Sequence, residues 1–146
     1  MVRALFLEYA ETLGVDLCFQ GFDREVASLP GGYAPPAGAL FLATTHTLPV
    51  GCVGIRALSG TEAELKRLYV RPEARGTGLG RRLVTEAIHA ARRIGYTLLR
   101  LDTLPSMLEA RALYQRIGFQ ETPSYRPNPI EGTTYLALDL TVDSLR

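Results

Sequence analysis

A glycine-rich segment that could bind a phosphate lies near the middle of the chain, Arg75-Gly76-Thr77-Gly78-Leu79-Gly80. It separates a strand-like run, Glu64–Val70, from an amphipathic helix that we predict over residues 79–94. The start of a helix leaves backbone N–H groups unpaired and carries the positive end of the helix dipole, so it attracts anions. Glycine has no Cβ to block the approach of a ligand to the backbone. We therefore predict a pyrophosphate site at this turn.

Arginine side chains beside the turn strengthen this prediction. Arg71 and Arg75 can donate paired hydrogen bonds to phosphate oxygens. Arg81, in the first turn of the helix, fits the same anion better than it fits a nucleic acid, because the other arginines of this helix spread around its surface. The residues assigned to the anion site are Arg75, Gly76, Thr77, Gly78, Leu79, Gly80 and Arg81.

Length and composition describe one ordinary globular domain, residues 1–146, with 47% hydrophobic and 21% charged residues. A net charge of +1 argues against a general nucleic-acid or membrane-surface role. The charged N-terminus does not resemble a signal peptide and no apolar run approaches the ~20 residues of a membrane span, so we expect a cytoplasmic protein. Cys18 and Cys52 form neither a disulfide framework nor a metal-ligand pattern, and we expect two free buried thiols and no metal.

Hydrophobic periodicity and glycine stop signals predict the order of the elements. Pro49 and Gly51 place a hairpin turn between the first two strands, and Gly95 and Gly118 end two of the helices. The predicted helices are residues 2–13, 20–28, 79–94 and 106–117, and the predicted strands are 39–45, 50–57, 62–70, 97–101, 119–122 and 134–140. The sequence therefore predicts an α/β (α+β) protein in which helices pack on a mixed sheet.

Two other nucleotide-binding motifs compete for the glycine turn. A dinucleotide-binding fold wants its glycines immediately after a strand, whereas Arg71–Arg75 intervene here, and the spacing is G-x-G-x-G. Asp102 ends the next predicted strand, about where a ribose-binding acid would stand, but a hairpin meander precedes the turn in place of a βαβ unit. A P-loop is excluded because no Gly-Lys-Ser/Thr follows.

Two motifs together carry a family resemblance. Arg75-x-x-Gly78-x-Gly80 at a strand-to-helix junction is followed by Ala110-x-x-Leu113-Tyr114-x-x-x-Gly118-Phe119. From about Leu40 to Leu140 the chain resembles the GNAT superfamily of acetyl-coenzyme A-dependent N-acetyltransferases. The resemblance implies a mostly antiparallel sheet of about six strands flanked by about four helices. It also implies that the glycine loop holds the pyrophosphate of coenzyme A. The preceding strand would splay from its neighbour and offer N–H groups to pantetheine and thioester, which maps to Leu68, Tyr69 and Val70.

The chain departs from the family pattern at two places. Family members often carry an asparagine where Met107 stands, so a hydrogen bond from that side chain is lost or moved to Ser106, and we place both residues in the coenzyme A site. The family usually begins with a β-strand, whereas this chain opens into a helix. Either the first strand is absent or the start codon has been placed too late, and both alternatives stay open.

Acetyl transfer to an amine needs a base, a stabilised thioester oxygen and an acid for the leaving thiolate. Glu64 lies eleven residues before Arg75, the spacing at which some GNAT branches carry a catalytic glutamate. The alternative for Glu64 is an ordinary place on the polar side of a strand, paired with Lys66 or Arg67. A bulge would free the N–H of Leu68 or Val70 for the oxygen.

Tyr114 stands where the resemblance puts the acid, and its alternative is a core tyrosine. The sequence thus predicts an N-acetyltransferase that moves an acetyl group from acetyl-CoA, its co-substrate, to a primary amine by direct attack. The alternative is a non-catalytic acyl-CoA-binding sensor.

The acceptor is expected to be a small-molecule or peptide amine. Four acidic residues in the segments that line the acceptor groove of relatives would favour a cationic acceptor: Asp16, Asp23, Glu25 and Glu131. The resemblance further implies a homodimer formed through the last strands.

Overall fold

The computed structural model describes residues 2–13, 22–125 and 131–142. Its helices are α1 (Val2–Leu13), α2 (Phe22–Ala27), α3 (Leu79–Ile94) and α4 (Leu108–Ile117), with short 3-10 turns η2 (Gly31–Tyr33) and η3 (Pro72–Ala74). Its strands are β1 (Ala39–Thr45), β2 (Leu48–Ala57), β3 (Glu62–Val70), β4 (Leu98–Thr103), β5 (Gln120–Glu121) and β6 (Thr134–Asp139). The predicted order of helices and strands is confirmed.

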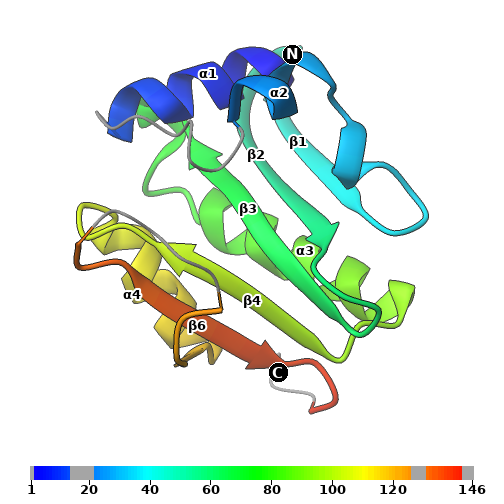
Figure 1. Ribbon diagram of the computed structural model, residues 1–146. Coiled ribbons are helices and arrows are strands. Elements are labelled where there is room, and N and C mark those ends of the chain that lie inside the picture. Colours follow the sequence, from blue (N-terminus) through cyan, green and yellow to red (C-terminus); the bar gives the residue numbers. More distant parts are fainter. Residues whose placement is uncertain (1, 14–21, 126–130, 143–146) are drawn as a thin grey trace.

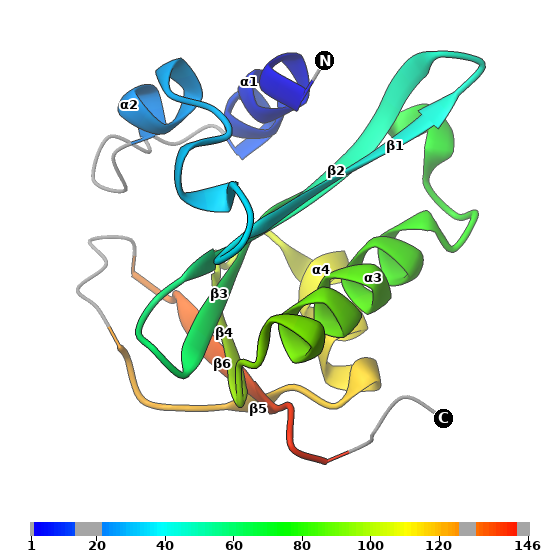
Figure 2. The same cartoon turned by 90° about the vertical axis from the view of Figure 1, so that its right-hand side faces the viewer.

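The strands form one six-stranded sheet in the order β1-β2-β3-β4-β6-β5. Only β3 and β4 run parallel, and every other neighbouring pair is antiparallel. α1 and α2 cover one face, and α3 and α4 cover the other (Figures 1 and 2). The predicted mostly antiparallel sheet of about six strands, with four helices in the described part of the chain, is therefore confirmed.

Each face of the sheet has its own hydrophobic core. The core beneath α3 and α4 includes Val84, Ile88, Leu99 and Leu101, all at most 1% exposed. The smaller core beneath α1 contains six buried residues: Leu5, Phe6, Val26, Tyr33, Cys52 and Tyr69. Burying each large apolar side chain contributes about 1.5–3 kcal/mol, so both helical layers are held firmly to the sheet.

The sheet opens between β3 and β4. These strands pair only from Glu62↔Leu98 to Glu64↔Arg100, whereas β4 stays paired with β6 as far as Thr103. From that point to the end of β3, the edge that faces β4 has no strand beside it (Figure 1). The structure thus contains the splay that the family resemblance implies.

A β-bulge lies in the unpaired half of β3. Cys52 pairs with Tyr69 but Gly54 pairs with Lys66, so two residues of β3 lie opposite one residue of β2. The bulged residue Arg67 has φ +62°, a left-handed conformation that is uncommon for a non-glycine residue. Because of the extra residue, the side chains that pack on the α3 side change from Ala63 and Leu65 before the bulge to Leu68 and Val70 after it.

Two local predictions are corrected. The hairpin turn between β1 and β2 is His46-Thr47, with φ values of 49° and 72°, and Pro49 and Gly51 lie inside β2. The polar side of β3, expected to face solvent, is buried, with Glu64 0% and Lys66 4% exposed. The alternation of side chains is correct, but α2 and the segment around Tyr125 contact this side and exclude water from it.

Among the described residues, no helix is long and apolar enough to cross a membrane, and no cluster of His, Cys, Asp or Glu is arranged to hold a metal ion. Cys52 is a free, buried thiol, and burial raises its pKa to about 12. Cys18 lies outside the described residues. The single domain over residues 1–146 stays a prediction.

Candidate active site

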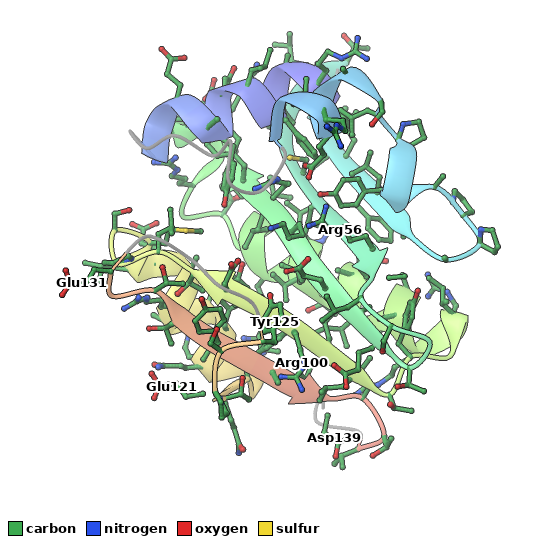
Figure 3. The ribbon with its side chains drawn as sticks, viewed as in Figure 1. Arg56, Arg100, Glu121, Tyr125, Glu131 and Asp139 are labelled. Atoms are coloured by element: carbon green, nitrogen blue, oxygen red, sulfur yellow. The ribbon has the colours of Figure 1, made fainter. Side chains whose placement is uncertain are left out.

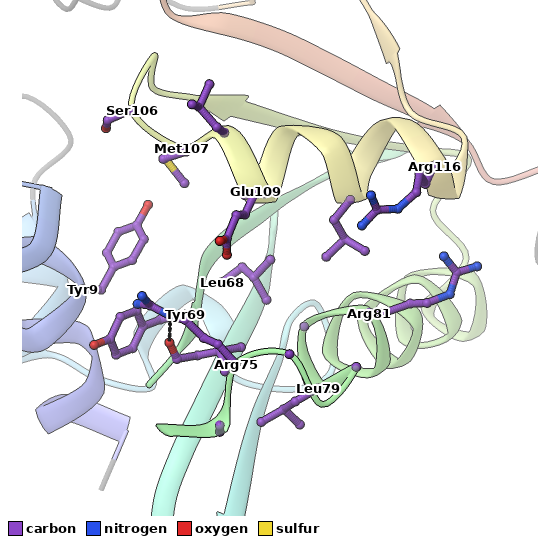
Figure 4. A pocket seen from close by; sticks show the side chains of 18 residues that line it. Tyr9, Leu68, Tyr69, Arg75, Leu79, Arg81, Ser106, Met107, Glu109 and Arg116 are labelled. Carbon is purple, nitrogen blue, oxygen red and sulfur yellow. Dashed lines mark hydrogen bonds between the residues drawn. The ribbon is translucent and has the colours of Figure 1, made fainter. Parts of the chain in front are cut away.

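A cleft of about 790 Å³ lies between the end of β3, the start of α3 and the start of α4 (Figure 4). This volume lies within the range of pockets that bind small molecules and cofactors. Among the residues that line it are nearly all those predicted to bind coenzyme A: Leu68, Tyr69, Val70, Arg75, Gly76, Gly78, Leu79, Gly80, Arg81, Ser106 and Met107. The exception is Thr77, which faces a second pocket on the β1–β2 side of the turn and donates from Oγ1 to the Ala74 carbonyl oxygen at 2.6 Å.

The glycine turn forms one wall of the cleft. Gly76 and Gly78 have φ values of +80° and +83°, which glycine adopts without the steric cost that a Cβ imposes. A Cβ added at either residue would meet no atom within 4 Å, so the space beside these glycines is open. The N–H of Arg82 donates to Gly78 O at 3.1 Å, and the three preceding N–H groups, those of Leu79, Gly80 and Arg81, therefore point out of the helix end. The turn has the geometry of an anion site.

Three arginines bring positive charge to this cleft. Arg75 donates from Nε to Val70 O at 2.9 Å, and its guanidinium lies 6.0 Å from the centre of the Tyr69 ring. Arg81 on α3 and Arg116 on α4 stand at the same end of the cleft (Figure 4). The arrangement suits a ligand with several phosphate groups.

Arg71, which the sequence predicted to bind phosphate, does not line this cleft. Its guanidinium donates to the Glu8 carboxylate on α1 at 2.6–3.1 Å and to Pro49 O at 2.7 Å. Sequence reasoning could not foresee this ion pair, because its partner lies 63 residues away. The prediction for Arg71 is corrected to a structural link between α1 and the end of β3.

The free edge of β3 turns backbone N–H groups toward the gap. Arg71 N–H donates to Val50 O at 2.8 Å, and hydrogen bonds alternate between the two edges of a strand. The N–H of Val70 therefore points away from β2, and that of Leu68, two residues earlier, lies on the same edge. The two residues line the cleft, so its floor offers donors to a carbonyl oxygen.

Tyr114 lies in the second turn of α4 and is 3% exposed, with its ring centre 5.4 Å from that of Phe119. Its α4 neighbours Ala110 and Leu113 line the cleft. Burial, together with the nearby groups Tyr9 and Asp102, raises the pKa of the phenol, so Tyr114 keeps its proton at neutral pH. The structure thus places the predicted acid behind the cleft wall and in its protonated form.

Glu64 lies on the other side of the sheet opening and does not line the cleft. Its carboxylate is fully buried and accepts from Arg56 Nε at 3.1 Å and from the Tyr125 hydroxyl at 2.6 Å. Figure 3 shows Arg56 and Tyr125 on the sheet face that α1 and α2 partly cover. Tyr125 is half-buried, so its hydroxyl connects the Glu64 carboxylate to this face. The alternative pairing with Lys66 or Arg67 did not anticipate either partner.

Lys66 is the only lysine in the sequence, and its side chain is 4% exposed. Burial and the neighbouring Arg67 charge lower its pKa to about 8, against the opposing influence of Glu64 and Asp102. Asp102 thus influences Lys66 on β3 as well as Tyr9 on α1 and Tyr114 on α4. Three elements therefore bring titratable groups together where the sheet opens.

Sequence reasoning missed two residues that line the cleft. Tyr9 reaches it from α1, and nothing in the local sequence signals a contact with a segment 60 residues later. Arg116 lies in the second motif, where its charge one turn before Gly118 could have been read as a phosphate ligand. Of the acidic residues expected to favour a cationic acceptor, Glu25 is bound to two arginines and Glu131 is exposed. Asp16 and the Asp23 side chain lie outside the described residues.

Comparison with known proteins identifies the family. The model of the acetyltransferase (GNAT) family matches residues 7–119. The chain belongs to the GNAT family. It is 40% identical over 141 residues to an uncharacterized N-acetyltransferase of Schizosaccharomyces pombe, an alignment that covers 95% of this chain and 86% of the relative. Membership makes the chain an acyltransferase, and the antiparallel meander before the glycine turn contradicts a dinucleotide-binding fold.

Solved structures show the same fold. A GNAT acetyltransferase from Staphylococcus aureus Mu50 superposes with a TM-score of 0.79, with 18% identity and coverage of 94% of this chain and 92% of the other. A GNAT acetyltransferase from Elizabethkingia anophelis, solved with acetyl-CoA bound, superposes with a TM-score of 0.59, with 23% identity and coverage of 70% and 76%. At these identities the likeness extends to the fold.

Proposed function

We propose that this GNAT protein transfers an acetyl group from acetyl-CoA to a primary amine of a small molecule or peptide, which attacks the thioester directly. The observation that carries the proposal is the cleft that joins the glycine turn to the free edge of β3. One end of this cleft offers helix N–H groups and arginines to a diphosphate, and the other offers strand N–H groups to a thioester.

The residues present fit acetyl-CoA. Gly76 and Gly78 leave open space where any other side chain would stand, and Arg81 and Arg116 lie at the same end of the cleft. Ser106, Met107 and Glu109 at the start of α4 face Tyr69 and Arg75 across the cleft (Figure 4). When bound, acetyl-CoA supplies an acetyl group already activated as a thioester.

The floor of the cleft stabilises the charge that develops on the thioester oxygen. The N–H groups of Leu68 and Val70 belong to the free edge of β3, and the fold holds them in place before the substrate arrives. Preorganised donors of this kind act without reorganisation, and loss of one typically costs about 3–4 kcal/mol of barrier. This contribution depends on backbone geometry and is therefore independent of the side chain at either residue.

Tyr114 and Glu64 move protons on opposite sides of the thioester. Tyr114 is protonated at neutral pH and donates its proton to the departing thiolate. Glu64 accepts the amine proton through the Tyr125 hydroxyl, which already donates to Glu64 Oε2 at 2.6 Å. Because Glu64 is fully buried, this relay gives it access to the acceptor side without exposure of the carboxylate.

A thiol-release assay with acetyl-CoA and a panel of amines tests the proposal. Direct attack predicts thiol release that requires both substrates and a sequential initial-rate pattern, whereas a covalent acetyl-enzyme gives ping-pong kinetics. Binding of acetyl-CoA without turnover of any amine would support the sensor alternative instead.

The relay is tested separately with Glu64→Gln, for which Glu62→Gln is the matched control. Glu62 lies on the same strand and pairs with Arg100 at 2.7 Å, away from Tyr125's partner. We expect a fall in kcat of about 100-fold for Glu64→Gln alone. Equal kcat values in the two variants would remove Glu64 from the mechanism.

A further inference from the structure

The bulge in β3 is held by a residue of a distant helix. Arg67 is the bulged residue, and its side chain is 2% exposed. Its guanidinium donates from Nε to Glu25 Oε2 at 2.8 Å and from a terminal nitrogen to Glu25 Oε1 at 3.1 Å. Glu25 lies on α2, 42 residues earlier in the chain. A two-point ion pair of this kind fixes orientation as well as distance.

Arg67 occupies a backbone conformation that its own side chain disfavours. Within the described strands it is the residue with positive φ, since the other two such non-glycine residues, His46 and Thr47, form the hairpin turn. Strained residues of this kind persist only when their surroundings hold them. Around Arg67 the surroundings are the Glu25 carboxylate, the Tyr9 ring at 5.9 Å and the Cys52 thiol, which donates to Arg67 O at 3.4 Å.

The ion pair is the strongest of these contacts. Burial alone would raise the pKa of the Glu25 carboxyl, but the hydrogen bonds and charge of Arg67 outweigh it and lower that pKa. The carboxylate also accepts from Arg56 at 3.3 Å, which fixes it from the β2 side. Two arginines of adjacent strands thus hold one carboxylate of α2, and through it the bulge.

We propose that Glu25 is a positioning residue for acetyl transfer, because its ion pair with Arg67 holds the bulge that places the Leu68 and Val70 N–H groups beside the thioester. The proposal rests on the proposed function, since it assigns those N–H groups a role in the reaction. Glu25 touches neither acetyl-CoA nor the reacting atoms and acts through the backbone of β3. Its chemistry is a constraint on φ at Arg67.

The proposal makes a distinctive demand on the residue at position 67. Glycine adopts φ +62° freely, whereas alanine meets the same steric cost as arginine. In the double variants Glu25→Gln/Arg67→Gly and Glu25→Gln/Arg67→Ala, neither charge of the pair remains and only the backbone preference differs. The glycine variant should keep the bulge without the ion pair, and the alanine variant should lose it.

The test compares kcat, KM for acetyl-CoA and the thermal midpoint in these two variants, in Glu25→Gln and in a matched control, Glu8→Gln. Glu8 pairs with Arg71 at 2.6 Å just beyond the same strand, but Arg71 has φ −59° and needs no such support. We expect Glu25→Gln to lower kcat at least tenfold with less than a threefold change in KM. Glu8→Gln should leave kcat within threefold of the wild type.

The glycine double variant should have a kcat at least tenfold above that of the alanine double variant, and a crystal structure should show φ near +60° at the glycine. Equal kcat values in the two double variants would overturn the proposal, whether both are high or both low. Failure of the proposed function is seen separately, because the wild-type protein would then release no thiol from acetyl-CoA with any amine.

Discussion

The substitution Gly78→Ala tests the anion site at its most specific residue. Gly78 has φ +83° and precedes α3, and an added Cβ would meet no protein atom within 4 Å. Within the protein the change therefore costs only backbone strain, about 1 kcal/mol or a fall of about 3 °C in the thermal midpoint for a chain of this size. A bound diphosphate would meet the new methyl group where it approaches the helix N–H groups.

The expected loss of affinity follows from those N–H groups. A hydrogen bond to a charged partner contributes about 1.5–3 kcal/mol, so losing one weakens acetyl-CoA binding by about 10- to 150-fold. The matched control is Gly95→Ala at the other end of α3, where φ is +111° and the space is equally open. Titration calorimetry and thermal unfolding on both variants separate strain from binding. Similar losses of stability with unchanged acetyl-CoA affinity in Gly78→Ala would refute the reasoning.

Three further predictions concern single side chains. Tyr114→Phe should lower kcat about 100-fold in the thiol-release assay and leave acetyl-CoA affinity unchanged, because the ring packing on Phe119 remains. Lys66, as the only lysine, gives one ¹³Cε lysine signal, which should titrate near pH 8 and not near 10.5. Between these pH values the unfolded chain holds more protons than the native one, so stability should rise with pH in this window, and Lys66→Met should remove that rise. Cys52 should resist alkylation in the native protein and react after unfolding, as measured by mass spectrometry.

The helices and strands could be predicted wherever local signals determine them. Gly78 and Gly95 adopt left-handed conformations at the two ends of α3, and the predicted bounds 79–94 are those observed. The turn between β1 and β2 could not be predicted, because His46 and Thr47 adopt positive φ without glycine and Pro49 drew the prediction two residues too far. Tight-turn geometry in this hairpin depends on strand pairing, which local sequence does not show.

The candidate site divides in the same way. The glycine turn and the strand before it were predicted, because their residues are contiguous in the sequence. The partners of Arg71 and Arg67 are carboxylates 63 and 42 residues earlier, and only the packing of α1 and α2 on the sheet brings them together. The burial of Glu64 likewise depends on Tyr125, which lies 61 residues later. Long-range electrostatic contacts of this kind have no periodic or local signature.

The central claim is that the backbone around Gly78 holds the diphosphate of a CoA thioester, and calorimetry with two ligands tests it most directly. Acetyl-CoA and S-acetylpantetheine carry the same thioester, but only acetyl-CoA has the diphosphate. We predict saturable binding of one acetyl-CoA per chain, with an affinity at least tenfold above that for S-acetylpantetheine. Equal affinities for the two ligands, or no saturable binding of acetyl-CoA, would contradict the account.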